Sequence, residues 1–110
     1  MYRLCLLFVT LAVVPSAAFA QASAIERGQK VYAAEKCSVC HSIAGQGNKR
    51  GALDGVGSTR SGDEIREWIV NATDAAAKAK ATRKPVMKSY GHMAKDDVDA
   101  LVAYLRSLVK

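Results

Sequence analysis

The sequence predicts an all-α protein made of a few short helices. Two segments, residues 64–69 and 98–108, carry apolar side chains at helical spacing. A third segment, residues 23–36, opens with a Ser-x-x-Glu pattern that is typical of a helix start. No stretch shows the apolar–polar alternation of a half-buried strand. The chain has 110 residues, which suits a single domain and excludes a multidomain enzyme.

The first twenty residues have the layout of a secretory signal peptide. Arg3 precedes an uncharged apolar run over residues 4–14, and Ala18-Phe19-Ala20 supplies small residues at the cleavage positions. This pattern predicts cleavage after Ala20, export to the periplasm and a mature domain over residues 21–110. The alternative is an uncleaved anchor helix, for which the apolar run is short, because a membrane span needs about 20 residues.

The predicted mature domain has few large side chains to bury. Both Phe residues of the chain fall within the leader. The only aromatic residues of the mature domain are Tyr32, Trp68, Tyr90 and Tyr104. Domains of this size are marginally stable even when their cores are well filled. A well-filled core made of protein alone is therefore not expected.

Three helices are expected in the mature domain. The first runs from Ser23 to about Lys36 and contains Gly28, which costs about 1 kcal/mol relative to Ala in a helix interior. Close approach by a second helix would explain this glycine. A second capping box, Ser61 with Glu64, opens a short helix that ends near residue 71.

The rest of the domain is expected to be loop up to the last helix. A Gly-rich loop follows His41, and the Ala- and Lys-rich segment 75–84 is expected to be a mobile or partly helical connector. Residues 85–91, which begin with Pro85, are expected to form a loop. The last helix, residues 95–109, begins with two Asp residues and is followed by a Lys, as the helix dipole favours.

The segment Cys37-Ser38-Val39-Cys40-His41 carries the chemistry. C-x-x-C-H is the attachment signature of c-type haem, in which each sulfur adds to one vinyl group and the histidine binds iron. A thioredoxin-type dithiol would need a βαβ setting. A zinc site would need four ligands, with the Cys and His pairs separated. A disulfide across so short a loop would stabilise little. The sequence therefore predicts one covalent haem c, which would also complete the thin core.

Three residues could supply a sixth ligand to the iron: Met87, Met93 and His92. Met87 lies in the loop after Pro85, whose fixed φ helps a single side chain to project. Met93 stands just before the last helix, where a bulky apolar residue ordinarily packs against the core. His92 lies in a polar turn. Ligation by His and Met leaves no open coordination site and favours outer-sphere electron transfer over catalysis.

The chain resembles the small monohaem class I cytochromes c of the bacterial periplasm over residues 23–109. Beyond the haem motif, the resemblance rests on five patterns. These are Gly28-x-x-x-Tyr32, Leu53-Asp54-Gly55-Val56-Gly57, Glu64-Ile65-Arg66-Glu67-Trp68-Ile69, Pro85-x-Met87-x-x-Tyr90 and Asp99-Ala100-Leu101-Val102-Ala103-Tyr104-Leu105. The resemblance implies a class I cytochrome c fold, with three to four short helices around one haem. It implies that Gly28 and Tyr32 cross the last helix near Tyr104, that Met87 is the second axial ligand, and that Trp68 and Tyr90 line the haem pocket.

Some positions depart from that family. Ala52 stands where the family usually has Pro, in the segment whose backbone carbonyl accepts the hydrogen bond from the proximal histidine. The resemblance therefore implies that Ala52 offers this carbonyl. Lys88 stands where a Pro often follows the ligand Met, and Ala94 stands where Ser or Thr often caps the last helix. None of these departures removes a ligand.

The charge pattern bears on partners. The chain has a net charge of +6, and residues 75–95 contain basic side chains but no acidic one. This basic segment flanks Met87, and its alternative interpretation is a solvated lysine face. We expect steering toward acidic-faced redox partners, including peripheral membrane complexes as donor or acceptor, and no nucleic acid.

The predicted function is that of a soluble, monomeric electron carrier rather than an enzyme. The alternatives are a haem subunit of a larger oxidoreductase or a ligand-binding haem sensor.

Overall fold

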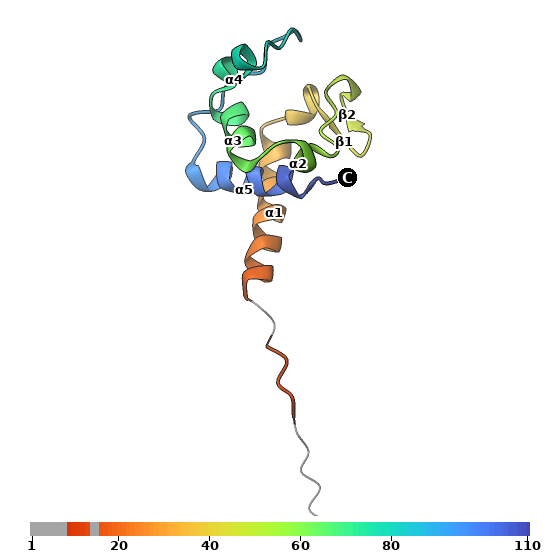
Figure 1. Ribbon diagram of the computed structural model, residues 1–110, viewed down its shortest axis with the longest axis vertical. Helices are drawn as coiled ribbons and strands as arrows, with labels where there is room; N and C mark the ends of the chain where they lie inside the picture. The colour runs from red at the N-terminus through yellow and green to blue at the C-terminus, as the bar shows by residue number, and fades with distance from the viewer. Residues whose placement is uncertain (1–8, 14–15) are drawn as a thin grey trace, which may run out of the picture.

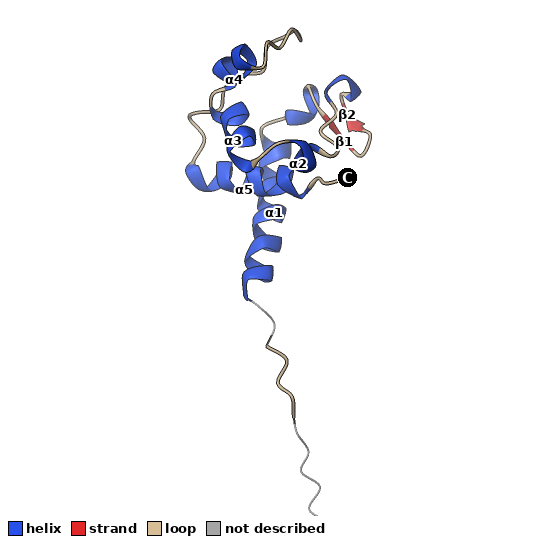
Figure 2. Cartoon of the chain, viewed as in Figure 1, coloured by secondary structure: helices blue, strands red, loops and turns tan. Residues whose placement is uncertain are grey.

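The computed structural model describes residues 9–13 and 16–110 of the chain, and its regular secondary structure is mostly helical (Figure 1). The helices are α1 (Ser16–Ala34), α2 (Val56–Thr59), α3 (Gly62–Val70), α4 (Ala72–Lys78) and α5 (Lys95–Ser107). Two 3₁₀ turns, Cys37–Val39 and Lys49–Gly51, flank a hairpin of two-residue strands, β1 (Ser42–Ile43) and β2 (Gln46–Gly47), which pair antiparallel (Figure 2). The prediction of an all-α fold is confirmed.

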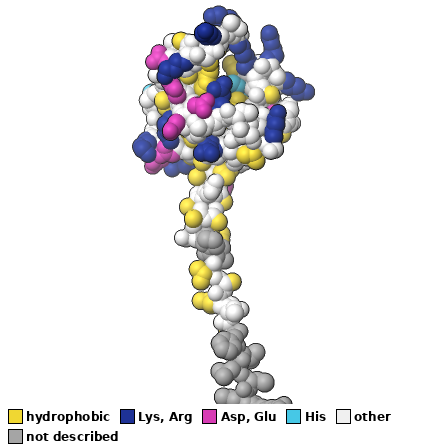
Figure 3. Space-filling view, in the orientation of Figure 1, with side chains coloured by type: hydrophobic (Ala, Val, Ile, Leu, Met, Phe, Trp, Pro, Cys, Tyr) yellow, Lys and Arg dark blue, Asp and Glu magenta, His cyan; other side chains and the backbone are white. Residues whose placement is uncertain are grey.

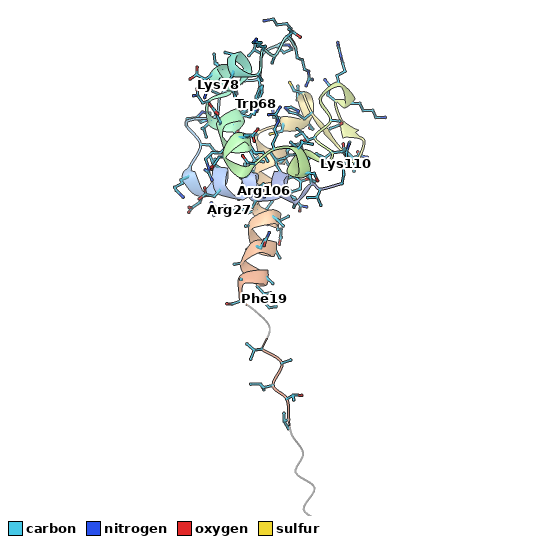
Figure 4. All side chains as sticks on the ribbon, in the orientation of Figure 1. Phe19, Arg27, Trp68, Lys78, Arg106 and Lys110 are labelled. Carbon is cyan, nitrogen blue, oxygen red and sulfur yellow. The ribbon has the colours of Figure 1, made fainter. Side chains whose placement is uncertain are left out.

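Helix α1 begins earlier than the capping pattern at Ser23 predicts. It starts at Ser16 and continues through Ala20, because the residues before Ser23 are rich in alanine, which has the highest helix propensity. The side chains of residues 16–23 are exposed, and this part of α1 projects from the body of the molecule, with Phe19 near its end (Figure 4). In the part of the chain described, no helix is both long and apolar enough to cross a membrane. The signal-peptide prediction falls partly on residues 1–8 and 14–15, which lie outside the described residues.

The crossing of α1 and α5 organises the fold, and it depends on Gly28. In Figure 1 α1 runs down the page and α5 runs across it. A Cβ on Gly28 would overlap the Ala100 carbonyl oxygen and lie 2.5 Å from the Tyr104 Cβ, so glycine allows this close approach. Next to it, the rings of Tyr32 and Tyr104 meet edge to face with centroids 6.0 Å apart. The expected close approach at Gly28 and the crossing near Tyr104 are therefore both observed.

The hydrophobic core lies between α3 and α5. Its buried cluster consists of Ile65, Ile69, Val98, Leu101, Val102 and Leu105. The capping box predicted from Ser61 and Glu64 is present, with the Glu64 backbone N–H donating to Ser61 Oγ at 3.2 Å and the Ser61 N–H donating to the Glu64 carboxylate at 3.3 Å. At the start of α5 the cap residue is Ala94, which makes no side-chain cap, as expected from its side chain. The core is small, in keeping with the few large side chains of the sequence.

The segment expected to be a mobile or partly helical connector divides into a helix and a loop. Helix α4 ends at Lys78, and its Ala72 and Ala75 are buried. Lys78 forms an ion pair with Glu67 of α3, with 2.5 Å between Nζ and Oε1. Residues 79–94 then form a loop that returns to α5; we call it the ligand loop, because it contains Met87, the second axial ligand that the resemblance predicts. Met87 therefore lies in the loop that joins α4 to α5, two helices that both pack on α3.

Candidate haem site

The haem motif forms one tight turn after α1. Lys36 takes a left-handed conformation (φ 56°), which ends the helix and starts the 3₁₀ turn over Cys37–Val39. The backbone N–H groups of Cys40 and His41 both donate to the Cys37 carbonyl, at 3.1 and 2.9 Å. Both cysteines are half-buried free thiols. Local backbone hydrogen bonds thus bring the two sulfurs and the imidazole of the motif into a single turn.

The His41 ring is fixed by its Nδ1 atom, which lies 2.9 Å from the Gly51 carbonyl oxygen. With Nδ1–H as donor, Nε2 is left unprotonated and able to bind a metal, an arrangement typical of metal-binding histidines. The carbonyl expected to accept this bond was that of Ala52, and that expectation is wrong by one residue. Ser42 pairs in parallel with Ala52, and the Leu53 N–H donates to the Ser42 carbonyl, so the register turns the Gly51 carbonyl toward His41.

Glycine at position 51 is required by close contacts. A Cβ there would overlap the Cys40 carbonyl oxygen and the Arg83 guanidinium. The residue that supplies the carbonyl to His41 therefore also lets the ligand loop approach the haem motif. No specific sequence signal marks this role, because Gly51 is one of several glycines in the same loop.

The electrostatics of the site favour a neutral imidazole. Burial lowers the pKa of His41 below 6.5, and the nearby positive charge of Arg83 lowers it further, against the opposing effect of the Gly51 hydrogen bond. Because a metal ligand must be unprotonated, this shift suits an axial ligand at neutral pH.

The pKa of the Cys37 thiol is shifted in the opposite direction to that of a redox-active cysteine. Burial, aided by the negative charge of Glu35, raises the pKa of Cys37 to about 11. Reactive cysteines have pKa values lowered below the free-thiol range. This shift agrees with the absence of a βαβ setting and argues against a thioredoxin-like function.

A buried hydroxyl next to the motif has no partner among the described residues. The Tyr32 hydroxyl is enclosed but makes no hydrogen bond. Burial raises the pKa of Tyr32 to about 12, with further contributions from Cys37 and Tyr104. Leaving such a group without a partner costs about 1–3 kcal/mol. An orphaned hydroxyl beside Cys37 fits a site that is completed by a polar-edged group such as haem, and the donor set of two thiols and one neutral imidazole fits the same group.

The structure separates the three candidates for the sixth ligand. Met93 packs against the core cluster, as expected for the residue before α5. His92 is exposed, with its ring 6.2 Å from that of Tyr90. Met87 is half-buried in the ligand loop and is not part of the core cluster. Met87 is thus the half-buried candidate whose side chain the core does not use.

Tyr90 links the ligand loop to the hydrophobic core. Its backbone N–H donates to the Ile69 carbonyl at 2.8 Å, which anchors the loop to α3. Burial raises the pKa of Tyr90, and the charges of Cys37, Glu35 and Cys40 raise it further.

Trp68 is placed differently from Tyr90. Its ring is half-buried, with the Arg60 guanidinium 5.5 Å from its centroid. It lines a shallow groove between α3 and α4, near Lys78 (Figure 4). The haem-pocket roles expected of Trp68 and Tyr90 both stay predictions.

Arg83 was not among the expected site residues. Its Nη2 donates to the Cys40 carbonyl at 2.6 Å, across 43 residues of sequence. In the sequence it is one of several basic residues in residues 75–95, and nothing in the pattern distinguishes it from a solvated charge.

Comparison with known protein families agrees with this geometry. The family model described as cytochrome c matches residues 25–109, which is most of the chain. The chain belongs to the cytochrome c family. No individual curated protein or solved structure is significantly similar to it. Family membership confirms the expected cytochrome c fold and implies a covalently bound haem c and haem-based electron transfer, with Cys37 and Cys40 at the C-x-x-C-H positions.

The basic segment of this cytochrome c is partly neutralised at its two ends. Lys78 pairs with Glu67, and Lys95 pairs with Asp99 at 2.7 Å. The bases between them are Lys80, Arg83, Lys84 and Lys88, and none forms an ion pair within the described part of the chain. In Figure 3 dark blue side chains gather over α4 and the loop beyond it, and again beside the β1–β2 hairpin.

The two basic regions adjoin at the haem motif. Arg83 lies against Gly51, which directly follows Lys49 and Arg50. Segments far apart in sequence therefore form one basic rim, which we define as Lys49, Arg50, Lys80, Arg83, Lys84 and Lys88.

Proposed function

We propose that this cytochrome c is an exported, soluble carrier of single electrons, with haem c attached through Cys37 and Cys40 and ligated by His41 and Met87. The observation that carries the proposal is the hydrogen bond from His41 Nδ1 to the Gly51 carbonyl. It holds the imidazole in the tautomer whose Nε2 can bind iron, next to the two thiols that tether the haem.

Haem c, when bound, supplies an iron that alternates between the ferrous and ferric states. The chain's own residues would fix both axial positions. His41 is oriented by backbone, and Met87 is half-buried in a loop that Tyr90 anchors to α3. With both positions filled by protein, substrate cannot reach the metal, so we propose a carrier and not an enzyme or a gas sensor.

The sixth ligand can be tested with two matched methionine variants. Met87→Leu and Met93→Leu each remove one thioether and keep nearly the same volume. We expect Met87→Leu to lose the red charge-transfer band of Met-ligated ferric haem and to bind carbon monoxide readily when reduced. Met93→Leu should keep the band and exclude carbon monoxide. Loss of the band in Met93→Leu alone would contradict the assignment of Met87, and so would a wild type that lacks the band and binds carbon monoxide readily only in a His92→Ala variant.

Export is supported by the way α1 projects from the body. Of the residues that the structure describes, cleavage after Ala20 would remove only exposed side chains, and it would leave the contact of Gly28 with α5 in place. We expect the periplasmic form to begin at Gln21 and to have the mass of residues 21–110 plus one haem. A protein that retains residues 1–20 and sediments with membranes would favour the anchor instead.

The basic rim supports steering of electron transfer by charge. Because the rim adjoins the haem motif, an anionic oxidant should be attracted to this edge and a cationic one repelled. With ferricyanide we expect the oxidation rate to fall as ionic strength rises, and with a cationic cobalt(III) complex we expect it to rise. Lys84→Gln should weaken both dependences more than Lys95→Gln, since Lys95 is already paired with Asp99. Flat profiles for both oxidants would dispose of steering.

We propose acidic-faced redox proteins, including peripheral parts of membrane complexes, as donor and acceptor. We also propose that the carrier is a monomer and has no nucleic-acid partner. Gel filtration of native periplasmic extract tests the free state directly. Elution at the mass of one chain is expected, whereas co-elution with a larger oxidoreductase would favour a bound haem subunit.

A further inference from the structure

One side chain joins the ligand loop to the haem motif. Arg83 Nη2 donates to the Cys40 carbonyl at 2.6 Å, and its Nη1 lies where a Cβ on Gly51 would stand. The guanidinium thus lies between two backbone groups that position His41. One is the carbonyl of Cys40, the residue before it, and the other is Gly51, whose carbonyl accepts the hydrogen bond from His41 Nδ1.

The rest of the ligand loop makes few polar contacts. Backbone hydrogen bonds hold it at Ala81, whose N–H donates to Ala76 at 2.9 Å, and at Tyr90, whose N–H donates to Ile69 at 2.8 Å. Between these anchors, in residues 82–89, the hydrogen bond of Arg83 is the only one within the described part of the chain. Met87 therefore lies in a span of backbone that one side chain ties down.

The chemistry of arginine suits this place better than that of a lysine. A guanidinium is always charged, and its planar group of donors can engage a carbonyl while lying flat against neighbouring backbone. Hydrogen bonds from a charged donor are stronger than neutral ones. Gly51 leaves room for the planar group, and its own carbonyl is taken by His41.

We propose that Arg83 is a positioning residue that fastens the ligand loop to the backbone of the haem motif and raises the reduction potential of the iron. Its fixed positive charge beside His41 disfavours the more positive ferric state, in which the iron has lost one electron to the acceptor. The proposal rests on the proposed function for the part that concerns Met87, and its fastening role stands on the contacts of Arg83 alone.

The test compares two variants that remove the same charge from neighbouring positions. Arg83→Gln loses the guanidinium, and Lys84→Gln loses an exposed charge one residue further along. In the haem-loaded protein, we expect hydrogen exchange at the two hydrogen-bonded amides that anchor the loop, Ala81 and Tyr90, to be about three- to tenfold faster in Arg83→Gln, the effect of losing a partly exposed charge-assisted hydrogen bond. Lys84→Gln should exchange like the wild type.

The potential and a conservative variant separate positioning from a general loss of charge. Arg83→Gln should have a lower midpoint potential than Lys84→Gln, and Arg83→Lys should recover most of the potential but only part of the loop protection. Equal exchange and equal potentials in Arg83→Gln and Lys84→Gln would overturn the proposal. A wild-type spectrum without the Met charge-transfer band would instead overturn the ligation by Met87, while the exchange comparison would still decide the role of Arg83.

Discussion

The two segments that would bind the iron are built in different ways. Residues 37–53 form a network of backbone hydrogen bonds, in which the Asn48 N–H donates to the His41 carbonyl at 2.9 Å and the Leu53 N–H donates to Ser42 at 2.8 Å. The ligand loop has backbone anchors near its two ends, and between them one hydrogen bond, from the Arg83 side chain. One half of the site is thus held throughout by the main chain, whereas in the other half the span around Met87 is held by a single guanidinium hydrogen bond.

This difference assigns different tasks to the two proposed ligands. Main-chain hydrogen bonds do not depend on side-chain identity, so His41 stays in place through most substitutions around it. Local opening is easiest where few backbone hydrogen bonds and few buried contacts hold a segment. Met87 is therefore the ligand that should exchange first when the site is perturbed, and the predictions below probe each half.

The largest effect is expected when both cysteines that would attach the haem are removed. In a Cys37→Ala, Cys40→Ala variant, the haem is no longer covalently held, and the small core between α3 and α5 has to support the fold alone. We expect the helical circular-dichroism signal to be largely lost. Cys5→Ala, which lies in the predicted leader, serves as the matched control and should leave the mature protein unchanged. A native-like helical spectrum of the double variant would refute the role of haem in the core.

A smaller effect is expected from a methyl group added to the main-chain half. In Gly51→Ala the new Cβ overlaps the Cys40 carbonyl, which is backbone and cannot move aside easily. We expect the free energy of unfolding to fall by about 1–3 kcal/mol, as is usual for overpacking. The midpoint potential should also shift, because the carbonyl that orients His41 is displaced.

Gly62→Ala is the control for this glycine, since a Cβ there would lie 3.2 Å from a flexible Arg106 side chain. It should be close to neutral in a chemical denaturation series. If Gly51→Ala is as stable as Gly62→Ala and keeps the wild-type potential, the main-chain half is less tightly held than its contacts indicate.

The smallest effect concerns the helical frame on which both halves rest. Hydrogen bonds from Lys95 and Arg66 lower the pKa of Asp99 below 3.8 and join α5 to α3. A carboxyl group with a lowered pKa in the folded state stabilises the fold above its unfolded pKa, and this stabilisation is lost as the pH falls below about 4. In Asp99→Asn, the free energy of unfolding should therefore depend less on pH in this acid range than in the wild type.

Asp96→Asn removes the same charge from the first turn of the same helix and is the matched control. Denaturation curves measured from neutral pH down to about pH 3 test the difference. Parallel pH profiles for Asp99→Asn and the wild type would show that this ion pair does not couple α3 to α5.

Much of the fold followed from local sequence signals. The Ser61–Glu64 capping box and the apolar spacing of residues 98–108 located α3 and α5, because each helix start and face is encoded by adjacent residues. The predicted start of α1 at Ser23 is too late in the chain, because an alanine-rich stretch can extend a helix beyond a capping pattern.

The site was predictable only in part. The haem motif is contiguous in sequence, so its residues were identified together. The Gly51 carbonyl and the Arg83 contact depend on how distant segments meet, which no local pattern specifies, and the carbonyl was accordingly assigned one residue too late, to Ala52.

The most direct test of the electron-carrier account is a redox titration of the purified haem-loaded protein, followed by its visible spectrum. We predict one reversible one-electron transition, a red charge-transfer band in the ferric state, and no ready binding of carbon monoxide in the ferrous state. A ferric spectrum without that band, together with rapid carbon monoxide binding after reduction, would show an open sixth position and contradict the account.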